Sequence, residues 1–142
     1  MMIRILRPTE TVEAIFDIDF ERLRILGKQA LLFDFDKTLA ARGSPIMPSV
    51  SNALLANLAT TGFRIGILTN RRPRRTIADV SYPIIYRARK PRRAGCLAML
   101  ETLSSSPEQA VMIGDRYITD VLGGNRLGIH TIRVKTYPAI QQ

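Results

Sequence analysis

Two aspartates separated by one residue, Asp34 and Asp36, follow an apolar run that begins at Ala30. In an extended strand, residues i and i+2 project to the same side, so both carboxylates can face one site. Adjacent carboxylates repel each other unless a cation or a proton lies between them, and Mg²⁺ prefers such oxygen ligands. The pair indicates either a magnesium-dependent site or, more simply, two acids that cap the following turn.

Three further polar clusters follow apolar runs later in the chain: Thr69-Asn70, Lys90, and the pair Asp115 and Asp120. In open α/β sheets, ligands bind beyond the carboxyl ends of the strands, so groups placed there can converge in one crevice. Each also has a simpler interpretation. Thr69 can be an ordinary strand residue, Lys90 part of a solvated run of arginines, and Asp120 an acid at a helix N-terminus.

Apolar runs and helical segments alternate along the chain, which is typical of parallel strands joined by helical crossovers. We expect strands at residues 30–35, 63–69, 83–86, 110–113 and 130–134, and helices at 49–62, 73–79, 92–103 and 120–127. The helix at 92–103 should bury Cys96, Leu97 and Leu100. Right-handed crossovers cover both faces of such a sheet. The sequence thus predicts an α/β fold, a three-layer, doubly wound, Rossmann-like parallel sheet of about five strands.

The segment before the first strand has a weaker pattern. Val12, Ile15, Phe16 and Ile18 predict a short helix that packs on the domain. No linker, repeat or low-complexity tract divides the chain. We therefore expect one domain over residues 1–142, with residues 1–29 packing on it.

The charge balance indicates phosphate-rich partners. The 142 residues include 21 Lys+Arg and 12 Asp+Glu, a net charge of +9, which favours nucleic acid, an anionic membrane or a phosphorylated substrate. Cys96 and His130, one of each type, cannot build a Cys/His zinc site or an internal disulfide. The absence of tryptophan disfavours a stacking platform for single-stranded nucleic acid.

Together, the polar clusters resemble the four motifs of the haloacid dehalogenase (HAD) superfamily. The matching segments are Asp34-Phe35-Asp36-Lys37-Thr38, Thr69-Asn70, Lys90-Pro91 and Gly114-Asp115-Arg116-Tyr117-Ile118-Thr119-Asp120. The resemblance implies that Asp34 attacks phosphorus and that Asp36 is the general acid and base. It implies that Thr69 and Lys90 are also catalytic, because they would bind and neutralise the phosphoryl group.

The same resemblance implies the remaining site residues. Thr38, Asn70 and Lys90 would bind substrate. Mg²⁺ would be held by Asp34, the backbone carbonyl of Asp36, and Asp115, with Asp120 supporting it through water or through the other ligands. Lys37 departs from the pattern, since many members have glycine there; it leaves the nucleophile and the acid/base unchanged.

A narrower resemblance is to the YqeG family, in subclass IIIA of the superfamily. It rests on Arg7-Pro8, Ile15-Phe16-Asp17-Ile18 and GDRYITDVLGGNRLGIHTIRV at residues 114–134. The family includes mitochondrial phosphatidylglycerophosphate phosphatases. The short stretches after Thr38 and between the second and third strands leave no room for a cap domain, so we expect an open crevice that admits a bulky phosphomonoester.

The YqeG resemblance implies dephosphorylation of phosphatidylglycerophosphate to phosphatidylglycerol, with an anionic phospholipid as partner. Arginines at residues 71–75 and 87–93 would attract an anionic membrane, unless they are simply solvated. Two alternatives stay open: a phosphatase for a sugar phosphate or a nucleic-acid end, and a non-catalytic RNA-binding module. The sequence does not indicate an oligomeric state.

The N-terminus is basic, and its apolar run is too short for a signal peptide. No transit-peptide pattern is visible. We therefore expect a bacterial cytoplasmic location, with peripheral contact at the inner face of the membrane.

Overall fold

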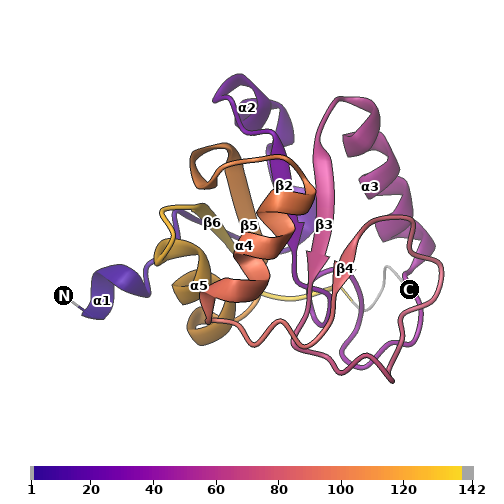
Figure 1. Ribbon diagram of the computed structural model, residues 1–142. Coiled ribbons are helices and arrows are strands. Elements are labelled where there is room, and N and C mark those ends of the chain that lie inside the picture. Colours follow the sequence, from indigo (N-terminus) through magenta and orange to yellow (C-terminus); the bar gives the residue numbers. More distant parts are fainter. Residues whose placement is uncertain (1, 139–142) are drawn as a thin grey trace.

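Six parallel strands form a single sheet in the order β1-β6-β5-β2-β3-β4. Figure 1 shows the computed structural model, which describes residues 2–138; Met1 and residues 139–142 of the expected domain lie outside the described residues. The strands are β1 (Glu10–Val12), β2 (Ala30–Phe33), β3 (Arg64–Leu68), β4 (Ile84–Ile85), β5 (Ala110–Gly114) and β6 (His130–Val134). The predicted α/β parallel sheet is confirmed, with one strand more than expected.

Five helices connect or flank these strands: α1 (Met2–Ile5), α2 (Phe20–Ile25), α3 (Ser49–Thr60), α4 (Arg93–Thr102) and α5 (Leu122–Asn125). Two 3₁₀ turns, Ile15–Asp17 and Pro107–Gln109, and a π-helical turn, Tyr117–Val121, complete the list for residues 2–138. Among these described residues, none of the helices has the length and apolar character needed to cross a membrane.

The sheet has an apolar core on each face, as the three-layer prediction requires. On one face, Leu55 of α3 belongs to the same buried cluster as Phe33 of β2. On the other, Met99 of α4 belongs to the cluster that contains Leu32. Leu32 and Phe33 are neighbours on a fully buried strand, so alternate residues of β2 supply the two cores. Cys96 lies in the second cluster, where burial raises the pKa of its thiol to about 11.

The N-terminal segment adds the sixth strand, where the sequence predicted a short helix over residues 12–18. β1 pairs with β6, with Val12 opposite Val134. The backbone N–H groups of Thr9 and Thr131 each donate to the other residue's hydroxyl, at 3.1 and 3.0 Å. Only the turn Ile15–Asp17 is helical there. Because the partner of this strand lies 122 residues away in the chain, local periodicity does not reveal it.

The helix predicted at residues 73–79 is wrong, because this segment is a series of turns. Its backbone pairs with the loop after β2 instead: Ala78 N donates to Pro45 O at 2.9 Å, and Met47 N donates to Ala78 O at 3.0 Å. This pairing ties two loops together at the carboxyl edge of the sheet.

Two helices differ in detail from their predictions. In α4, Leu97 is 46% exposed, and Met99 rather than Leu97 shares the buried face with Cys96. The helix expected at 120–127 is preceded by the π-helical turn that begins at Tyr117. That earlier start carries the chain from Asp115 directly into helical structure beside the carboxyl end of β5.

Candidate functional site

A cavity of about 240 Å³ opens beyond the carboxyl ends of β2, β3 and β5. Six of the eight predicted site residues line it: Asp34, Asp36, Thr69, Asn70, Lys90 and Asp115. The remaining lining residues are Lys37, Arg42, Gly43, Arg71, Arg75, Arg116 and Thr119. The structure therefore brings together side chains that the sequence spreads over more than eighty residues. Thr38 and Asp120 do not line the cavity.

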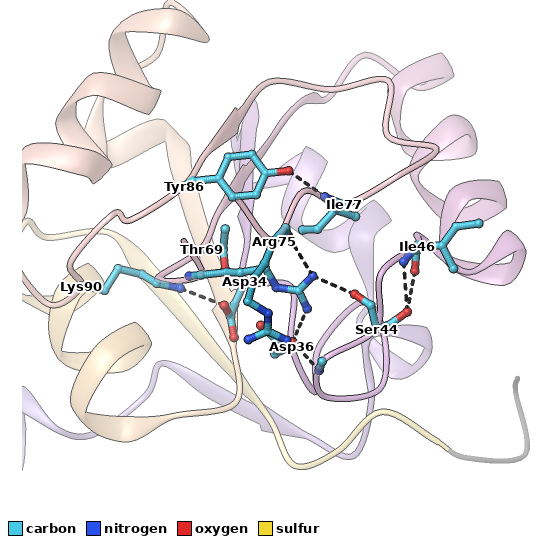
Figure 2. Close-up of polar contacts among 11 residues, drawn as sticks. Asp34, Asp36, Ser44, Ile46, Thr69, Arg75, Ile77, Tyr86 and Lys90 are labelled. Carbon is cyan, nitrogen blue, oxygen red and sulfur yellow. Dashed lines mark hydrogen bonds and ion pairs between the residues drawn. The ribbon is translucent and has the colours of Figure 1, made fainter. Parts of the chain in front are cut away.

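The ammonium group of Lys90 lies between two carboxylates at the base of the cavity. Its Nζ is 3.0 Å from Asp34 Oδ1 and 2.7 Å from Asp120 Oδ1; Figure 2 shows Lys90 reaching Asp34 from the side opposite Ser44. Burial alone would lower the pKa of Lys90, but the charges of Asp120 and Asp34 outweigh it and the pKa is raised. Burial, opposed by Lys90, raises the pKa of Asp34 to about 7. A nearby cation would favour ionised Asp34.

Asp34, Asp115 and Asp120 form a cluster that suits a hard divalent cation. One carboxylate oxygen from each lies within 4.8 Å of the other two, and three carboxylates are the oxygen donors that Mg²⁺ prefers. Asp120 differs from the others, because its Oδ1 accepts from Lys90 and its Oδ2 accepts from Arg116 N at 3.2 Å. Asp34 and Asp115 face the cavity, whereas Asp120 is 1% exposed and holds Lys90 in place.

The carboxylate of Asp36 is not part of that cluster. Its Oδ1 accepts from Arg71 Nη2 at 2.6 Å and from Gly43 N at 2.7 Å. Partial burial would raise the pKa of Asp36, but these two hydrogen bonds and the charges of Arg71 and Arg75 outweigh burial and lower it. The carboxyl group of Asp36 thus lies on the wall of the cavity formed by the loop that contains Gly43.

Arg71 was expected among the arginines at residues 71–75 that attract a membrane or are solvated, but the structure buries it within the site. Its side chain is 2% exposed, its guanidinium lies 4.9 Å from the centre of the Phe35 ring, and its Nη1 donates to Ser44 O at 2.7 Å and Arg75 O at 3.4 Å. It therefore joins Asp36 to two loops. The only signal in the sequence is a basic residue two positions after Thr69, which a run of arginines conceals.

Thr69 and Asn70 organise the end of β3. The hydroxyl oxygen of Thr69, which lines the cavity, accepts from Arg71 N at 3.0 Å, and within residues 2–138 its own hydrogen has no acceptor. The side chain of Asn70 accepts from Lys90 N at 2.8 Å and donates to Lys90 O at 3.2 Å. Asn70 therefore fixes the backbone of Lys90, and its amide is used within the protein.

Thr38 and Lys37 lie on the turn after Asp36 with opposite exposures. Thr38 is fully buried and its hydroxyl has no hydrogen-bond partner among the described residues, so the structure does not bring it to the cavity wall. Lys37 is exposed, lines the cavity, and has φ of 62°. That left-handed conformation is the one that glycine adopts most readily, which accounts for the glycine of the superfamily pattern at this position.

Comparisons with known proteins find relatives over most of the chain. Residues 87–137 match the family described as HAD-hydrolase-like. The chain is 32% identical over 137 residues to the probable phosphatase YqeG of Bacillus subtilis, covering 94% of this chain and 80% of the relative. It is 28% identical over 130 residues to the chloroplastic phosphatidylglycerophosphate phosphatase 1 of Chlamydomonas reinhardtii, covering 83% of this chain and 48% of that relative.

Solved structures share the fold at low identity. A crystal structure of an uncharacterized protein from Listeria monocytogenes serotype 4b superposes with a TM-score of 0.60 at 21% identity, covering 75% of this chain and 78% of that chain. The crystal structure of a hypothetical protein from Xanthomonas campestris superposes with a TM-score of 0.58 at 17% identity, covering 91% of this chain and 77% of that chain.

Proposed function

The chain belongs to the YqeG family of HAD-like phosphatases, and from that premise we propose that it hydrolyses an anionic phosphomonoester with Mg²⁺, using Asp34 as nucleophile. The observation that carries the proposal is the convergence of Asp34, Asp36, Thr69, Lys90 and Asp115 on one cavity. These side chains come from the ends of separate strands and loops, and a binding surface alone would not require this set.

Asp34 would act in two displacements. In the first, its free carboxylate oxygen attacks phosphorus, the bond from phosphorus to the ester oxygen breaks, and the leaving alkoxide takes a proton from Asp36. In the second, water attacks phosphorus, Asp36 accepts the proton of that water, and the bond to Asp34 breaks to release phosphate. Lys90, 3.0 Å from Asp34 Oδ1, leaves the other oxygen of Asp34 free to attack.

The charged groups around Asp34 would stabilise the transferred phosphoryl group. Thr69 would donate its free hydrogen to a phosphoryl oxygen, and Lys90 would offset negative charge there. Mg²⁺, held by Asp34, the backbone carbonyl of Asp36, and Asp115, would neutralise the carboxylates and the phosphoryl oxygens. Asp120 would support this arrangement by holding Lys90.

Asp36 must be protonated in the first step and ionised in the second. Its hydrogen bonds from Arg71 and Gly43 lower its pKa in the free protein, so the ionised form prevails before substrate binds. A dianionic phosphomonoester beside Asp36 would raise that pKa, because like charge disfavours the ionised carboxylate. Substrate binding would thereby supply the acid form that the first step needs.

Phosphatidylglycerophosphate is the substrate that we favour. The Chlamydomonas relative is named for that activity and matches 83% of this chain, although the chain spans only about half of that relative's length. The open cavity and exposed arginines at its rim are compatible with an anionic lipid held at a bilayer surface. We propose peripheral contact with the inner face of the cytoplasmic membrane.

The test is phosphate release from phosphatidylglycerophosphate in mixed micelles, with a sugar phosphate and a phosphorylated oligonucleotide in parallel. Each substrate is assayed with Mg²⁺ and with chelator, using the wild type and Asp34→Asn. We expect Mg²⁺-dependent release that prefers the lipid and is lost in Asp34→Asn. Preference for a soluble substrate would refute the lipid assignment and retain the mechanism. Release that persists in Asp34→Asn would refute the nucleophile.

A further inference from the structure

The cavity holds more positive charge than its carboxylates and one phosphoryl group would balance. Four carboxylates lie at or beneath it, those of Asp34, Asp36, Asp115 and Asp120. Two of them are neutralised by Lys90 and Arg71, which make ion pairs there, and a bound Mg²⁺ would neutralise the other two.

Four lining residues then retain their charge: Lys37, Arg42, Arg75 and Arg116. Within residues 2–138, none of the four makes an ion pair with a carboxylate. A dianionic phosphomonoester would balance only two of these charges, so the cavity can accept a further anionic group.

Arg42 and Arg75 both line the cavity, on the two loops that meet at Asp36. The N–H of Gly43, the residue after Arg42, donates to Asp36 Oδ1 at 2.7 Å. Arg75 Nη2 would be 3.6 Å from a Cβ placed on Gly43. The guanidinium of Arg71 links the two loops, because its Nη1 donates to both Ser44 O and Arg75 O.

These two loops are fixed by buried contacts. Arg71, with a side chain 2% exposed, donates to the carbonyls of Ser44 and Arg75 and to Asp36. The side chains of Arg42 and Arg75 are exposed, but the buried Arg71 joins the backbones of the two loops that carry them. A pair of guanidinium groups presented in this way can bind the oxygens of a phosphate or carboxylate by charge-assisted hydrogen bonds.

The position of Asp36 indicates which part of the substrate meets the two loops that carry Arg42 and Arg75. In the proposed reaction Asp36 protonates the leaving oxygen, so the alcohol attached to that oxygen extends on the side of Asp36. The geometry points to a second anion site, formed by Arg42 and Arg75, that binds a negatively charged group within the leaving alcohol. A phosphodiester joined to the scissile ester by a short linker has this chemistry. The inference rests on the proposed function, because it uses the assigned role of Asp36.

The experiment compares substrates that differ in the second charge and in the lipid. p-Nitrophenyl phosphate and phosphatidic acid lack a charged leaving alcohol. Phosphatidylglycerophosphate and its deacylated headgroup carry a phosphodiester there, with and without acyl chains. The value of kcat/KM is measured with Mg²⁺ for the wild type, Arg42→Gln and Arg75→Gln. Arg126→Gln, at the exposed end of α5 and outside the cavity, controls for loss of one positive charge.

We expect Arg42→Gln and Arg75→Gln to lower the preference for diester-bearing substrates over p-nitrophenyl phosphate by about tenfold, since each removes a charged hydrogen-bond donor. Arg75→Lys should recover part of the preference, and Arg126→Gln should retain it. An equal fall in kcat/KM on all four substrates, or no fall on any of them, overturns the proposal. So does a loss confined to the two lipids, which would place the arginines against the bilayer.

Binding separates this proposal from the phosphatase assignment. In the Asp34→Asn background, calorimetric titration with the deacylated headgroup measures affinity without turnover. A fall of about tenfold on adding Arg75→Gln supports the anion site even when the wild type hydrolyses none of the substrates; in that event the phosphatase proposal fails and the site survives. Unchanged affinity overturns the site whatever the wild type hydrolyses. Circular dichroism of each variant shows that it is folded.

Discussion

Arg71 connects more of the candidate site than any other single side chain described above. Its guanidinium is buried against Phe35 and donates to one carboxylate and two backbone carbonyls. A planar guanidinium can satisfy acceptors in several directions at once, whereas an ammonium on a flexible stem cannot do so with the same geometry. Arg71 therefore acts as a positioning residue for Asp36 and for the loops that carry Arg42 and Arg75.

Replacement of Arg71 tests this role. We expect Arg71→Met to lower the free energy of unfolding by about 1–3 kcal/mol, because it leaves two partly buried carbonyls and the carboxylate of Asp36 without their donor. The kcat with phosphatidic acid, whose alkoxide leaving group needs a proton, should fall about 100-fold, the usual contribution of a positioned general acid. Arg71→Lys should recover stability more than kcat. Unfolding is followed in urea, and a folded Arg71→Met variant with unchanged kcat would refute the role.

Lys90 makes ion pairs with two buried carboxylates, those of Asp34 and Asp120. Without Lys90, these two carboxylates should repel each other. In chelator, Lys90→Met should lower the free energy of unfolding by about 3–5 kcal/mol, since it leaves Asp34 and Asp120 without their buried partner. Millimolar Mg²⁺ should restore part of the loss, because a cation at the same carboxylates replaces the missing charge. Urea unfolding with and without Mg²⁺ measures both effects.

A surface lysine provides the comparison for Lys90. Lys135 pairs with Glu13 at 3.2 Å, and both side chains are more than half exposed. Lys135→Met should change stability little, with or without Mg²⁺. Equal stabilities of Lys90→Met and the wild type in chelator would show that the pairing of Lys90 contributes nothing.

At the scale of elements, the end of β5 and the following π-helical turn must approach closely to place Asp120. A Cβ on Gly114 would overlap the carboxyl group of Asp120. Glycine at this position therefore lets the turn fold back under the strand, where Asp120 accepts from Lys90 and from Arg116 N.

Gly114→Ala should displace Asp120 and so weaken the whole cluster. We expect a loss of stability of about 1–3 kcal/mol from overpacking and a fall in Mg²⁺ affinity of at least about tenfold, typical of lost support behind a metal ligand. Gly62→Ala is the control: its φ is 105°, but a Cβ there meets no atom within 4 Å. It should lower stability without changing Mg²⁺ affinity, measured by calorimetry. The same Mg²⁺ affinity in both variants would contradict the close approach.

The edge strand β1 is held by an ion-pair cluster that depends on pH. Glu10 accepts from Arg22 of α2 and lies 2.6 Å from His130 of β6. Burial would raise the pKa of Glu10, but its hydrogen bonds with Arg22 and His130 and their charges lower it below the usual value of 4.5. A depressed folded-state pKa contributes stability above the unfolded value, which is lost as pH falls through the folded value.

Glu10→Gln should therefore destabilise the chain at pH 7 by a small amount, because Arg22 is partly solvated. The difference from the wild type should shrink as the pH falls below the usual value of 4.5 and through the lowered folded-state pKa of Glu10. Urea midpoints at several pH values measure the difference. A constant difference across this range would show that the carboxylate charge of Glu10 is not involved.

Sequence patterns predicted the elements whose neighbours along the chain define them. β2, β3, β5 and β6 are short apolar runs with clear ends, and α3 and α4 have helical periodicity, so the central sheet was predictable. β1 was not, because its pairing with β6 depends on a distant strand. The turns at residues 73–79 were mistaken for a helix, because their backbone pairs with the loop after β2.

The site residues also fall into two groups, those that local sequence patterns predict and those that depend on distant contacts. Asp34, Asp36, Thr69, Lys90 and Asp115 each follow a strand or match a motif, so their convergence could be predicted from topology. The roles of Arg71 and Asn70 could not. Arg71 contacts Ser44 on a distant loop, and Asn70 contacts Lys90 on another. The amino-acid sequence alone does not indicate such long-range contacts.

At the scale of the whole molecule, apolar and basic side chains lie together at the turn between Arg116 and Thr119, two residues that line the cavity. Tyr117 is 44% exposed and Ile118 is 59% exposed on the turn that follows Arg116. Arg133 lies 4.4 Å from the centre of the Tyr117 ring. Exposed apolar residues beside cations suit the interface of an anionic bilayer, and this edge of the sheet also carries the cavity.

Vesicle binding tests this orientation. On phosphatidylcholine vesicles with about 30% phosphatidylglycerol, Ile118→Ser should lower binding about threefold or more, through lost apolar burial. Ile25→Ser is the matched control, since Ile25 is 73% exposed on α2, near the amino end of β2 and away from the cavity. Sedimentation measures bound protein. If Ile25→Ser lowers vesicle binding more than Ile118→Ser does, the opposite edge of the sheet faces the membrane and the proposed orientation is wrong. RNA that competes with vesicles for the protein would favour the nucleic-acid alternative.

The buried thiol of Cys96 has a consequence for oxidative chemistry. It is the one cysteine of this sequence, it lies on the buried face of α4, and burial raises its pKa to about 11. Since the thiolate is the form that peroxide and alkylating reagents attack, very little of it is present near neutral pH. Unlike phosphatases that use a cysteine nucleophile, this chain should keep its activity after exposure to hydrogen peroxide or iodoacetamide.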